Sequence, residues 1–145
     1  MNTVLLAWMK ANEGKIVSSP KNGAKNFEIS EVNENKEMVK IRFEGREHLA
    51  LPLTFKMFER ALVTISKKPG EWIRLGTSIR NAQPNTIEGE IWKKPFPINY
   101  KIPYKSASHV CDFLVLSGLA EYGKTVNPIS GKKVQAIRSI IRVNN

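Results

Sequence analysis

The residues that are able to act as nucleophile, general base or metal ligand are few in this sequence of 145 residues. It contains one Asp, Asp112, one Cys, Cys111, and two His, His48 and His109. A Ser-His-Asp or Cys-His arrangement would have to be assembled from these residues, and their spacing does not indicate one. Glycine-rich phosphate loops and zinc-ligand spacings are absent from the sequence. We therefore expect a protein that is not an enzyme and that uses no cofactor.

The nearest approach to a catalytic pattern is the nuclease-like segment Glu34-Asn35-Lys36. A metal-dependent nuclease needs a further acidic residue on a neighbouring strand and a buried setting. Glu28 could supply the acid, but a run of Glu and Lys in a loop is usually a solvated surface. We interpret the segment as a polar hairpin loop and predict no metal site.

Basic residues are the second group with functional chemistry, and they are unevenly distributed. The chain carries 23 Lys and Arg against 13 Asp and Glu, a formal net charge of +10. Residues 1–50 hold eight basic and seven acidic residues, a net of +1, which leaves fifteen and six, a net of +9, for residues 51–145. This balance favours a polyanionic partner, either nucleic acid or an anionic membrane surface. A solubilising lysine surface is the alternative interpretation.

Cys111 and the N-terminus indicate the compartment. Cys111 lies in an apolar run and has no second cysteine to pair with, so we expect a buried thiol. The apolar residues 4–9 end at Lys10, which makes them too few for a membrane span or a signal peptide. We expect an intracellular, reducing location, cytoplasmic or with the DNA in the nucleoid or nucleus, and no membrane contact.

Residues 1–53 are predicted to form a short helix and an antiparallel β meander. Thr3 is expected to cap a helix that ends near Asn12. Apolar and polar residues alternate in residues 27–30 and again in 39–44, as in strands with one buried face. Pro52 would confine a third strand to the edge of the sheet.

In residues 54–104 the alternation ends, and the apolar residues first follow the spacing of a helix. Apolar residues of 55–65 share one helix face, and Thr54 is a plausible cap. A short strand is predicted in 71–76. A short helix follows, which begins with a capping-box spacing at 85–88 and continues to Trp92, with a strand as the alternative because of Gly89. Three prolines exclude regular structure from the following residues 93–104, so an extended, basic, aromatic-rich connector is expected there.

The last elements resemble the final helix and wing of winged helix-turn-helix proteins. An apolar helix over 106–117, capped by Ser106, ends in Gly118-Leu119 and leads into a strand. The turn 127–131 then leads through Lys132 and Lys133 into a second strand. The resemblance covers residues 54–142. It is to the superfamily as a whole and to no particular member. The long connector departs from the tight turn of ordinary members.

The alternation and the resemblance together predict an α+β fold, with an N-terminal helix and a small antiparallel β meander (1–53) followed by the winged-helix domain that the resemblance implies (54–145). The final helix would face the major groove and the wing would follow the backbone. We predict a regulator, or the DNA-recognition part of a larger system, that binds nucleic acid, foremost double-stranded DNA. Asp112 would lie on the solvent face of the helix. The expected interface residues are Lys93, Lys94, Lys101, Lys105, Ser106, Ser108, His109, Lys124, Lys132, Lys133 and Arg138.

Two other functions remain open. A winged helix can bury its recognition face in a protein partner or in a second copy of itself, and the final helix lacks the Arg, Asn and Gln that most often read bases. The connector interleaves lysines with Trp92, Phe96, Tyr100 and Tyr104, rings that could stack on the bases of RNA or single strands, although core packing is the expected role for most of them. If about six basic residues contact phosphates, the logarithm of the affinity should fall against that of the salt concentration with a slope near −5.

Overall fold

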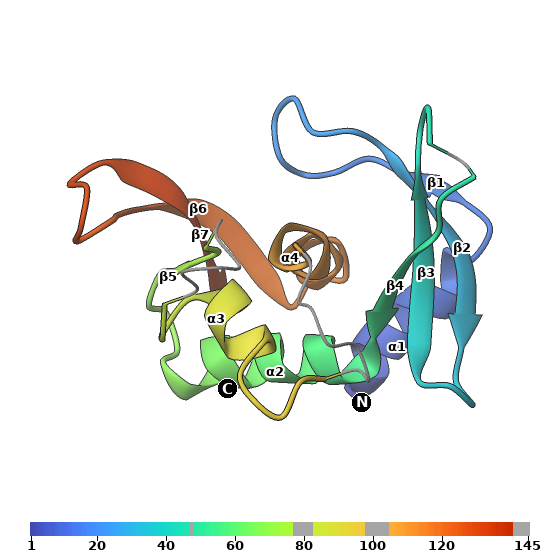
Figure 1. The fold of residues 1–145 in the computed structure, drawn as a ribbon, viewed down its shortest axis with the longest axis horizontal. Helices are drawn as coiled ribbons and strands as arrows, with labels where there is room; N and C mark the ends of the chain where they lie inside the picture. The colour runs from blue at the N-terminus through green and yellow to red at the C-terminus, as the bar shows by residue number, and fades with distance from the viewer. Residues whose placement is uncertain (47, 77–82, 98–104, 141–145) are drawn as a thin grey trace, which may run out of the picture.

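The computed structural model describes residues 1–46, 48–76, 83–97 and 105–140, and Figure 1 shows their arrangement. Helix α4 (Ala107–Leu116) is seen end-on at the centre, with a sheet on either side and α2 (Phe55–Lys67) below it. The other helices are α1 (Thr3–Ala11) and α3 (Ile87–Ile91). The strands are β1 (Ile16–Val17), β2 (Phe27–Asn33), β3 (Met38–Phe43), β4 (Leu51–Thr54), β5 (Ile73–Arg74), β6 (Ala120–Val126) and β7 (Lys133–Ser139). The fold is mixed α+β, as predicted.

The N-terminal sheet is the predicted antiparallel meander, in the order β1-β2-β3-β4. Ile29 lies opposite Ile41, and Val39 lies opposite Leu53, and all four side chains are buried. Residues at alternate positions share a face of a strand, so this register places the apolar positions of the sequence on one inner face. Strand β4 lies at the edge of the sheet, as predicted from Pro52. An edge strand pairs with one neighbour only, so a residue without a backbone N–H is tolerated there.

The second half of the chain follows the order α2, β5, α3, α4, β6, β7. Its three strands form an antiparallel sheet with β7 in the middle, in the order β5-β7-β6. Strands β6 and β7 continue beyond their contact with the helices as a hairpin that projects from the body of the molecule (Figure 1). We call this hairpin, residues 120–139, the wing.

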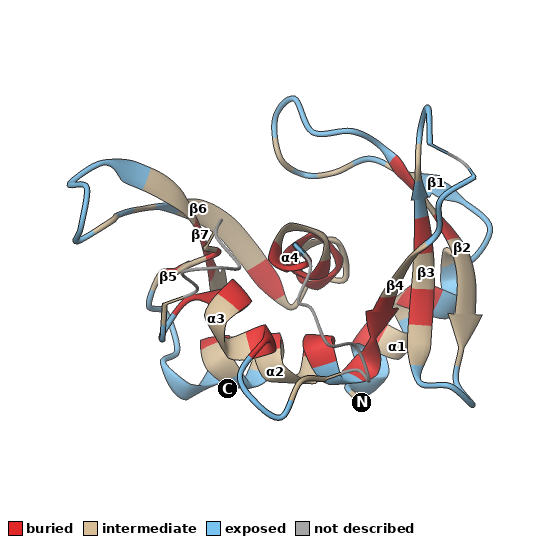
Figure 2. Cartoon of the chain, in the orientation of Figure 1, coloured by how far each residue is buried: buried red, intermediate tan, exposed pale blue. Residues whose placement is uncertain are grey.

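Phe113 of α4 lies at the centre of the hydrophobic core. Its ring stacks on that of Phe27 in β2, with the centroids 5.7 Å apart. It also meets the rings of Trp8 in α1 and Phe58 in α2, at 5.3 and 5.1 Å. Both halves of the chain therefore contribute to one core, and Figure 2 shows its buried residues along α2, α4 and the facing strands. Burying one such ring contributes roughly 2–3 kcal/mol.

Two helix caps differ from the expected ones by one residue. The side chain of Asn2, rather than that of Thr3, accepts the hydrogen bond at the start of α1. At α3 the acceptor is Thr86 rather than Asn85. Asn and Thr both provide a side-chain oxygen at the right reach, so residue type alone does not decide between adjacent candidates.

The start of α4 is capped by a residue from another helix. Thr54 and Ser106 occupy the N-cap positions of α2 and α4, as predicted, but neither hydroxyl bonds to its own helix. Instead, the Glu88 carboxylate of α3 accepts hydrogen bonds from the backbone N–H groups of Ser106 and Ala107, at 3.0 and 2.6 Å. A carboxylate at this position also interacts favourably with the helix dipole. Burial raises the pKa of Glu88, and the two backbone hydrogen bonds oppose that shift.

Replacement of Glu88 by Gln tests this cap. The variant keeps the shape of the side chain but turns an amide NH₂ toward one of the two N–H donors. We expect Glu88→Gln to lower the free energy of unfolding by about 1–3 kcal/mol, measured by urea denaturation. Glu90→Gln on the same helix is the control, because among the described residues Glu90 accepts one long bond, from the N–H of Asn85 at 3.3 Å. Equal losses in the two variants would contradict the capping role.

Candidate nucleic-acid interface

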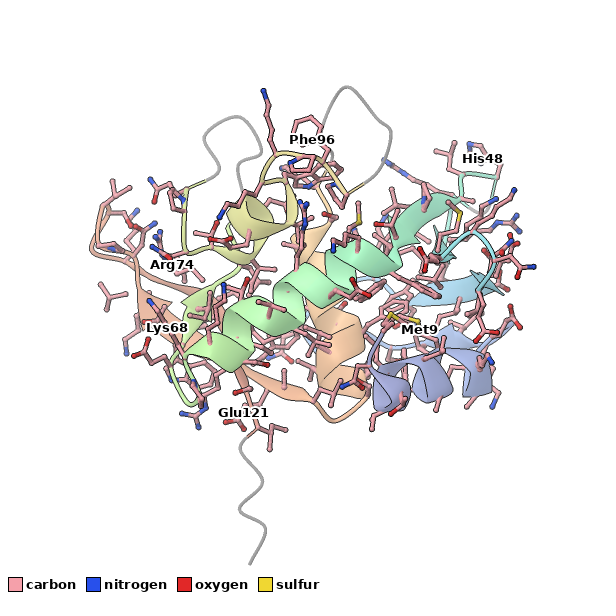
Figure 3. The ribbon with its side chains drawn as sticks, turned by 90° about the horizontal axis from the view of Figure 1, so that it is seen from below. Met9, His48, Lys68, Arg74, Phe96 and Glu121 are labelled. Atoms are coloured by element: carbon pink, nitrogen blue, oxygen red, sulfur yellow. The ribbon has the colours of Figure 1, made fainter. Side chains whose placement is uncertain are left out.

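The predicted interface residues are dispersed in the structure, and their exposed lysines lie on different elements. Lys93 and Lys94 are exposed in the turn that follows α3. Lys124, Lys132 and Lys133 are exposed in the wing. The turn and the wing lie at different sides of the molecule in both Figure 1 and Figure 3. No single surface therefore carries all the basic residues that the sequence suggested.

Arg60 of α2 holds the backbone of the turn after α3. Its guanidinium donates hydrogen bonds to the carbonyl oxygens of Ile91, Lys93 and Pro95, at 2.8, 2.6 and 2.6 Å. The main chain is thus tied to the protein while the side chains of Lys93 and Lys94 point to solvent.

The aromatic residues of the described part of the connector pack against the protein. Trp92 is buried, and Phe96, labelled in Figure 3, meets its ring edge-on at 5.8 Å. Tyr100, Tyr104 and Lys101 lie outside the described residues, and Lys105 is exposed just before α4. The buried Trp92 gives no support to base stacking by this residue.

The structure corrects the expectation that the first turn of α4 faces a nucleic acid. Ser106 is only 1% exposed, and its hydroxyl accepts a hydrogen bond from the indole N–H of Trp92 at 3.2 Å. Ser108 is half-buried, and its carbonyl accepts a bond from the Lys21 ammonium at 3.1 Å. The reason is that α4 packs on both sides, against α2 and against the N-terminal sheet, so it cannot enter a major groove as it stands here.

His109 likewise belongs to an internal contact. Its ring packs against Phe43 of β3, with the centroids 4.8 Å apart. Burial lowers its pKa from the ordinary 6.5 to about 4; Lys21 acts in the same direction, and Asp112 opposes them. The imidazole is therefore neutral at pH 7 and offers a phosphate no positive charge.

A buried cluster of Lys21, Asp112 and Tyr122 joins the loop before β2 to α4 and β6. The Lys21 ammonium donates to the Asp112 carboxylate, to the Tyr122 hydroxyl at 3.2 Å and to the Ser108 carbonyl at 3.1 Å. The Tyr122 hydroxyl donates to the same carboxylate oxygen at 2.5 Å. The Asp112 side chain is 3% exposed and that of Lys21 is 16% exposed. Burial raises the pKa of Tyr122, so its hydroxyl keeps the proton that it donates.

This cluster differs from the expectation that Asp112 lies on the solvent face of the helix. Asp112 is the only acid in residues 107–116, and because a carboxylate is rarely buried without a partner, the solvent face was the expected place for it. The identity of its partner could not be read from the sequence. Lys21 is 91 residues away, and nothing distinguishes it from the other lysines.

Side chains of the wing divide between two faces. The register pairs Lys124 with Gln135, Val126 with Lys133 and Tyr122 with Ile137. Residues that pair across the two strands point to the same face of the hairpin, and so do residues two positions apart on one strand. Lys124, Gln135 and Lys133 therefore lie on the same face as Tyr122, which contacts α4.

The opposite face of the wing holds Arg138, whose charge is already engaged. Its guanidinium donates to the Glu121 carboxylate at 2.5 Å and lies over the Trp72 ring, 4.2 Å from the centroid. Gly123 provides the space for this ring, because a Cβ there would approach Trp72 to 2.3 Å. Arg138 therefore acts in packing the wing onto the body, which differs from its predicted role in binding phosphate.

The tip of the wing is tied to the body through Asn127. The side-chain oxygen of Asn127 accepts hydrogen bonds from the backbone N–H of Ile129 at 2.9 Å and from the guanidinium of Arg74 at 3.3 Å. Its backbone carbonyl accepts a bond from the N–H of Gly131 at 2.8 Å. These bonds order the turn that presents Lys132 and Lys133.

A cleft of about 550 Å³ separates the wing from the loop before β2. Residues 20–24 line one side, and Tyr122, Gly123, Lys124 and Gln135 line the other. Figure 1 shows the loop above α4 and the wing beside it. Among the described residues that line this cleft, none is acidic. Lys21 and Tyr122 are lining residues too, so the buried cluster connects the two walls.

Other kinds of site have less support in the part of the chain that the structure describes. Within it, no group of three or more His, Cys, Asp or Glu is placed to hold a metal ion. Glu34, of the nuclease-like segment, pairs with Lys10 at 2.8 Å on the surface. Cys111 is a free, buried thiol, and burial raises its pKa. None of the described helices combines the length and apolarity needed to cross a membrane.

Removal of one member of the buried ion pair should destabilise the protein. Lys21→Met leaves the Asp112 carboxylate buried without its cation, and we expect a loss of about 3 kcal/mol in the free energy of unfolding. The double variant Lys21→Met/Asp112→Asn should recover part of this loss, because it removes the uncompensated charge. Lys25→Met, an exposed lysine of the same loop, is the matched control. Denaturation curves for these proteins and for the single variant Asp112→Asn give the comparison, and a double variant whose loss equals the sum of the two single losses would contradict the pairing.

His109 should make stability depend on pH between about 4 and 6.5. Its folded pKa is depressed, so the unfolded chain binds the proton more readily, and stability is lost as the pH falls through this window. We expect His109→Gln to remove up to about 3 kcal/mol of this dependence, measured as the difference between the pH profiles of unfolding. An NMR titration in which the His109 ring gains its proton near pH 6.5 would contradict the prediction.

The chain was compared with models of protein families, with curated proteins and with solved structures, and none of these comparisons finds a match. The interpretation of the site therefore depends on its geometry and chemistry.

Proposed function

We propose that the protein binds nucleic acid through the wing, with Lys124, Lys132 and Lys133 as the phosphate contacts. In this proposal α4 reads no bases, because its first turn is occupied by contacts within the protein. Lys93 and Lys94 follow α3, on a turn away from the wing, and are not part of the proposed interface.

The order of the elements supports a winged-helix interpretation of residues 55–139. Helix α2, strand β5, helices α3 and α4 and the hairpin β6–β7 follow one another, and β7 lies between β5 and β6. This is the order that the resemblance in the sequence implies. We infer a winged-helix unit whose recognition helix has become a core helix, covered by the N-terminal half of the chain.

The observation that carries the proposal is the charge of the wing. Lys124, Lys132 and Lys133 are exposed, and none of them forms an ion pair with a described residue. The hairpin projects from the body, and the Asn127 bonds order its tip (Figure 1). Ordered cations that have no carboxylate partner are suited to phosphates, since binding releases the counterions of the nucleic acid.

Charge reversal in the wing tests this function. With three lysines on phosphates, the slope of log affinity against log salt should be about −3 for a duplex, shallower than the −5 that the sequence suggested. Lys132→Glu/Lys133→Glu should weaken binding by at least about tenfold at low salt and bring the slope near −1. Fluorescence anisotropy of a labelled oligonucleotide over a range of salt concentrations measures both quantities.

The matched control is Lys67→Glu/Lys68→Glu, which makes the same change in net charge. These two lysines are also consecutive and exposed, and they lie at the C-terminal end of α2, with Lys68 labelled in Figure 3. The control should bind almost as tightly as the unchanged protein. If both double variants lose affinity equally, binding depends on net charge alone and the wing has no special role.

Exposed apolar residues at the wing tip favour a protein partner as the second candidate. Val126 is 55% exposed and Ile129 is 70% exposed, beside the lysines of the turn. A tip of this kind could enter a pocket on a partner. Val126→Ser/Ile129→Ser would then abolish binding to a co-purifying protein and leave nucleic-acid affinity unchanged.

A further inference from the structure

We propose that the cleft between residues 20–24 and the wing holds one strand of nucleic acid, so that the preferred ligand is single-stranded. This inference rests on the proposed function and specifies its substrate class. It differs from stacking on the aromatic connector, because it uses another part of the molecule and depends on phosphates rather than on rings.

The charges of the wing point to this side. Lys124 lines the cleft, and the register places Lys133 on the same face of the hairpin, two positions beyond Gln135. Because the described lining residues include no acid, a phosphate here meets cations and neutral hydrogen-bonding groups. Lys21 adds little net charge, since its ammonium is neutralised by Asp112.

The opposite wall, residues 20–24, is ordered by contacts within the protein. Lys21 fixes the loop to α4 and β6, and its backbone N–H is bonded to the Ser19 hydroxyl at 3.2 Å. Gly23 takes a left-handed conformation, with φ of +74°, which turns the chain at the rim. Asn22 and Ala24 are exposed on this wall. A groove with ordered walls loses little entropy when a flexible strand enters it.

The size of the cleft favours a single strand over a duplex. Its volume of about 550 Å³ is within the range of roughly 300–1,000 Å³ that receives ligands of nucleotide size. A duplex resting on the wing could touch the lysines of the tip, but α4 lies behind the loop and is closed to it. A single strand can follow the groove inward to Lys124, in the manner of basic grooves that track a phosphate backbone.

Two other hollows suit a polyanion less well. One, of about 300 Å³, lies beside β2 and β3, and its walls include Glu28 and Glu44 against a single Arg42. The other, of about 140 Å³, is lined by Lys67, Lys68 and Lys93 together with Glu90. It can accommodate little more than one phosphate group, and a carboxylate lies in its wall.

A carboxylate placed on the loop wall tests the inference. Ala24→Glu adds a negative charge at an exposed lining residue, while Ala24→Gln adds the same bulk without charge. Ala50→Glu, at an exposed position outside the lining, controls for net charge. The probes are a deoxythymidine oligonucleotide of about 12 nucleotides, within the site sizes of strand-binding domains, and a duplex of the same length.

We expect the unchanged protein to bind the single strand more tightly than the duplex. Ala24→Glu should lower the affinity for the single strand by about tenfold and that for the duplex by less than about twofold. Ala24→Gln and Ala50→Glu should change both affinities little. Unchanged melting temperatures establish that the variants are folded.

The outcomes separate this inference from the function on which it rests. If the duplex binds more tightly, or if Ala24→Glu weakens neither ligand or both equally, the single-strand inference is wrong, while the effect of the wing variant can still stand. If neither probe binds the unchanged protein, both proposals are wrong.

Discussion

Helix α4 is covered on both sides and carries a buried carboxylate, which requires a cation beside it. The arrangement of the parts around the helix depends on this requirement. Asp112 lies on α4 among side chains of the core and cannot remain charged there without a partner. Lys21 supplies the charge and Tyr122 supplies a second hydrogen bond. The loop that carries Lys21 is thereby held over α4 and opposite the wing. The position of this loop, and with it the cleft, depends on this contact.

The same contact changes how a winged-helix pattern is interpreted. An apolar helix followed by a basic hairpin suggests a reading helix and a supporting wing, but α4 here has neighbours on both sides. Phe113 meets rings from α1, β2 and α2, and His109 packs on Phe43. A helix that bridges two halves of a core stabilises the protein at the expense of access. The function proposed above therefore places binding on the hairpin, whose exposed lysines form no ion pair with a described residue.

The sequence predicted the features that depend on near neighbours. The spacing of apolar residues in 55–65, the alternation around Ile29 and Ile41 and the proline of an edge strand are local signals, and the elements formed as expected. The features that it did not predict depend on distant neighbours. Glu88 caps a helix that begins 19 residues later, and Asp112 binds a lysine 91 residues earlier. The solvent face of α4 was misassigned because the covering sheet belongs to another part of the chain.

The long separation between Lys21 and Asp112 also bears on the order in which the protein is made and folded. During synthesis Lys21 is made long before Asp112, so the inner face of the N-terminal meander is exposed until α4 has been made. The loop closes only when α4 and β6 exist, and closing it carries the entropic cost of a non-local contact. The region that forms last on this route is the region of the cleft. The packing of the core and the proposed binding surface are therefore completed in the same late event.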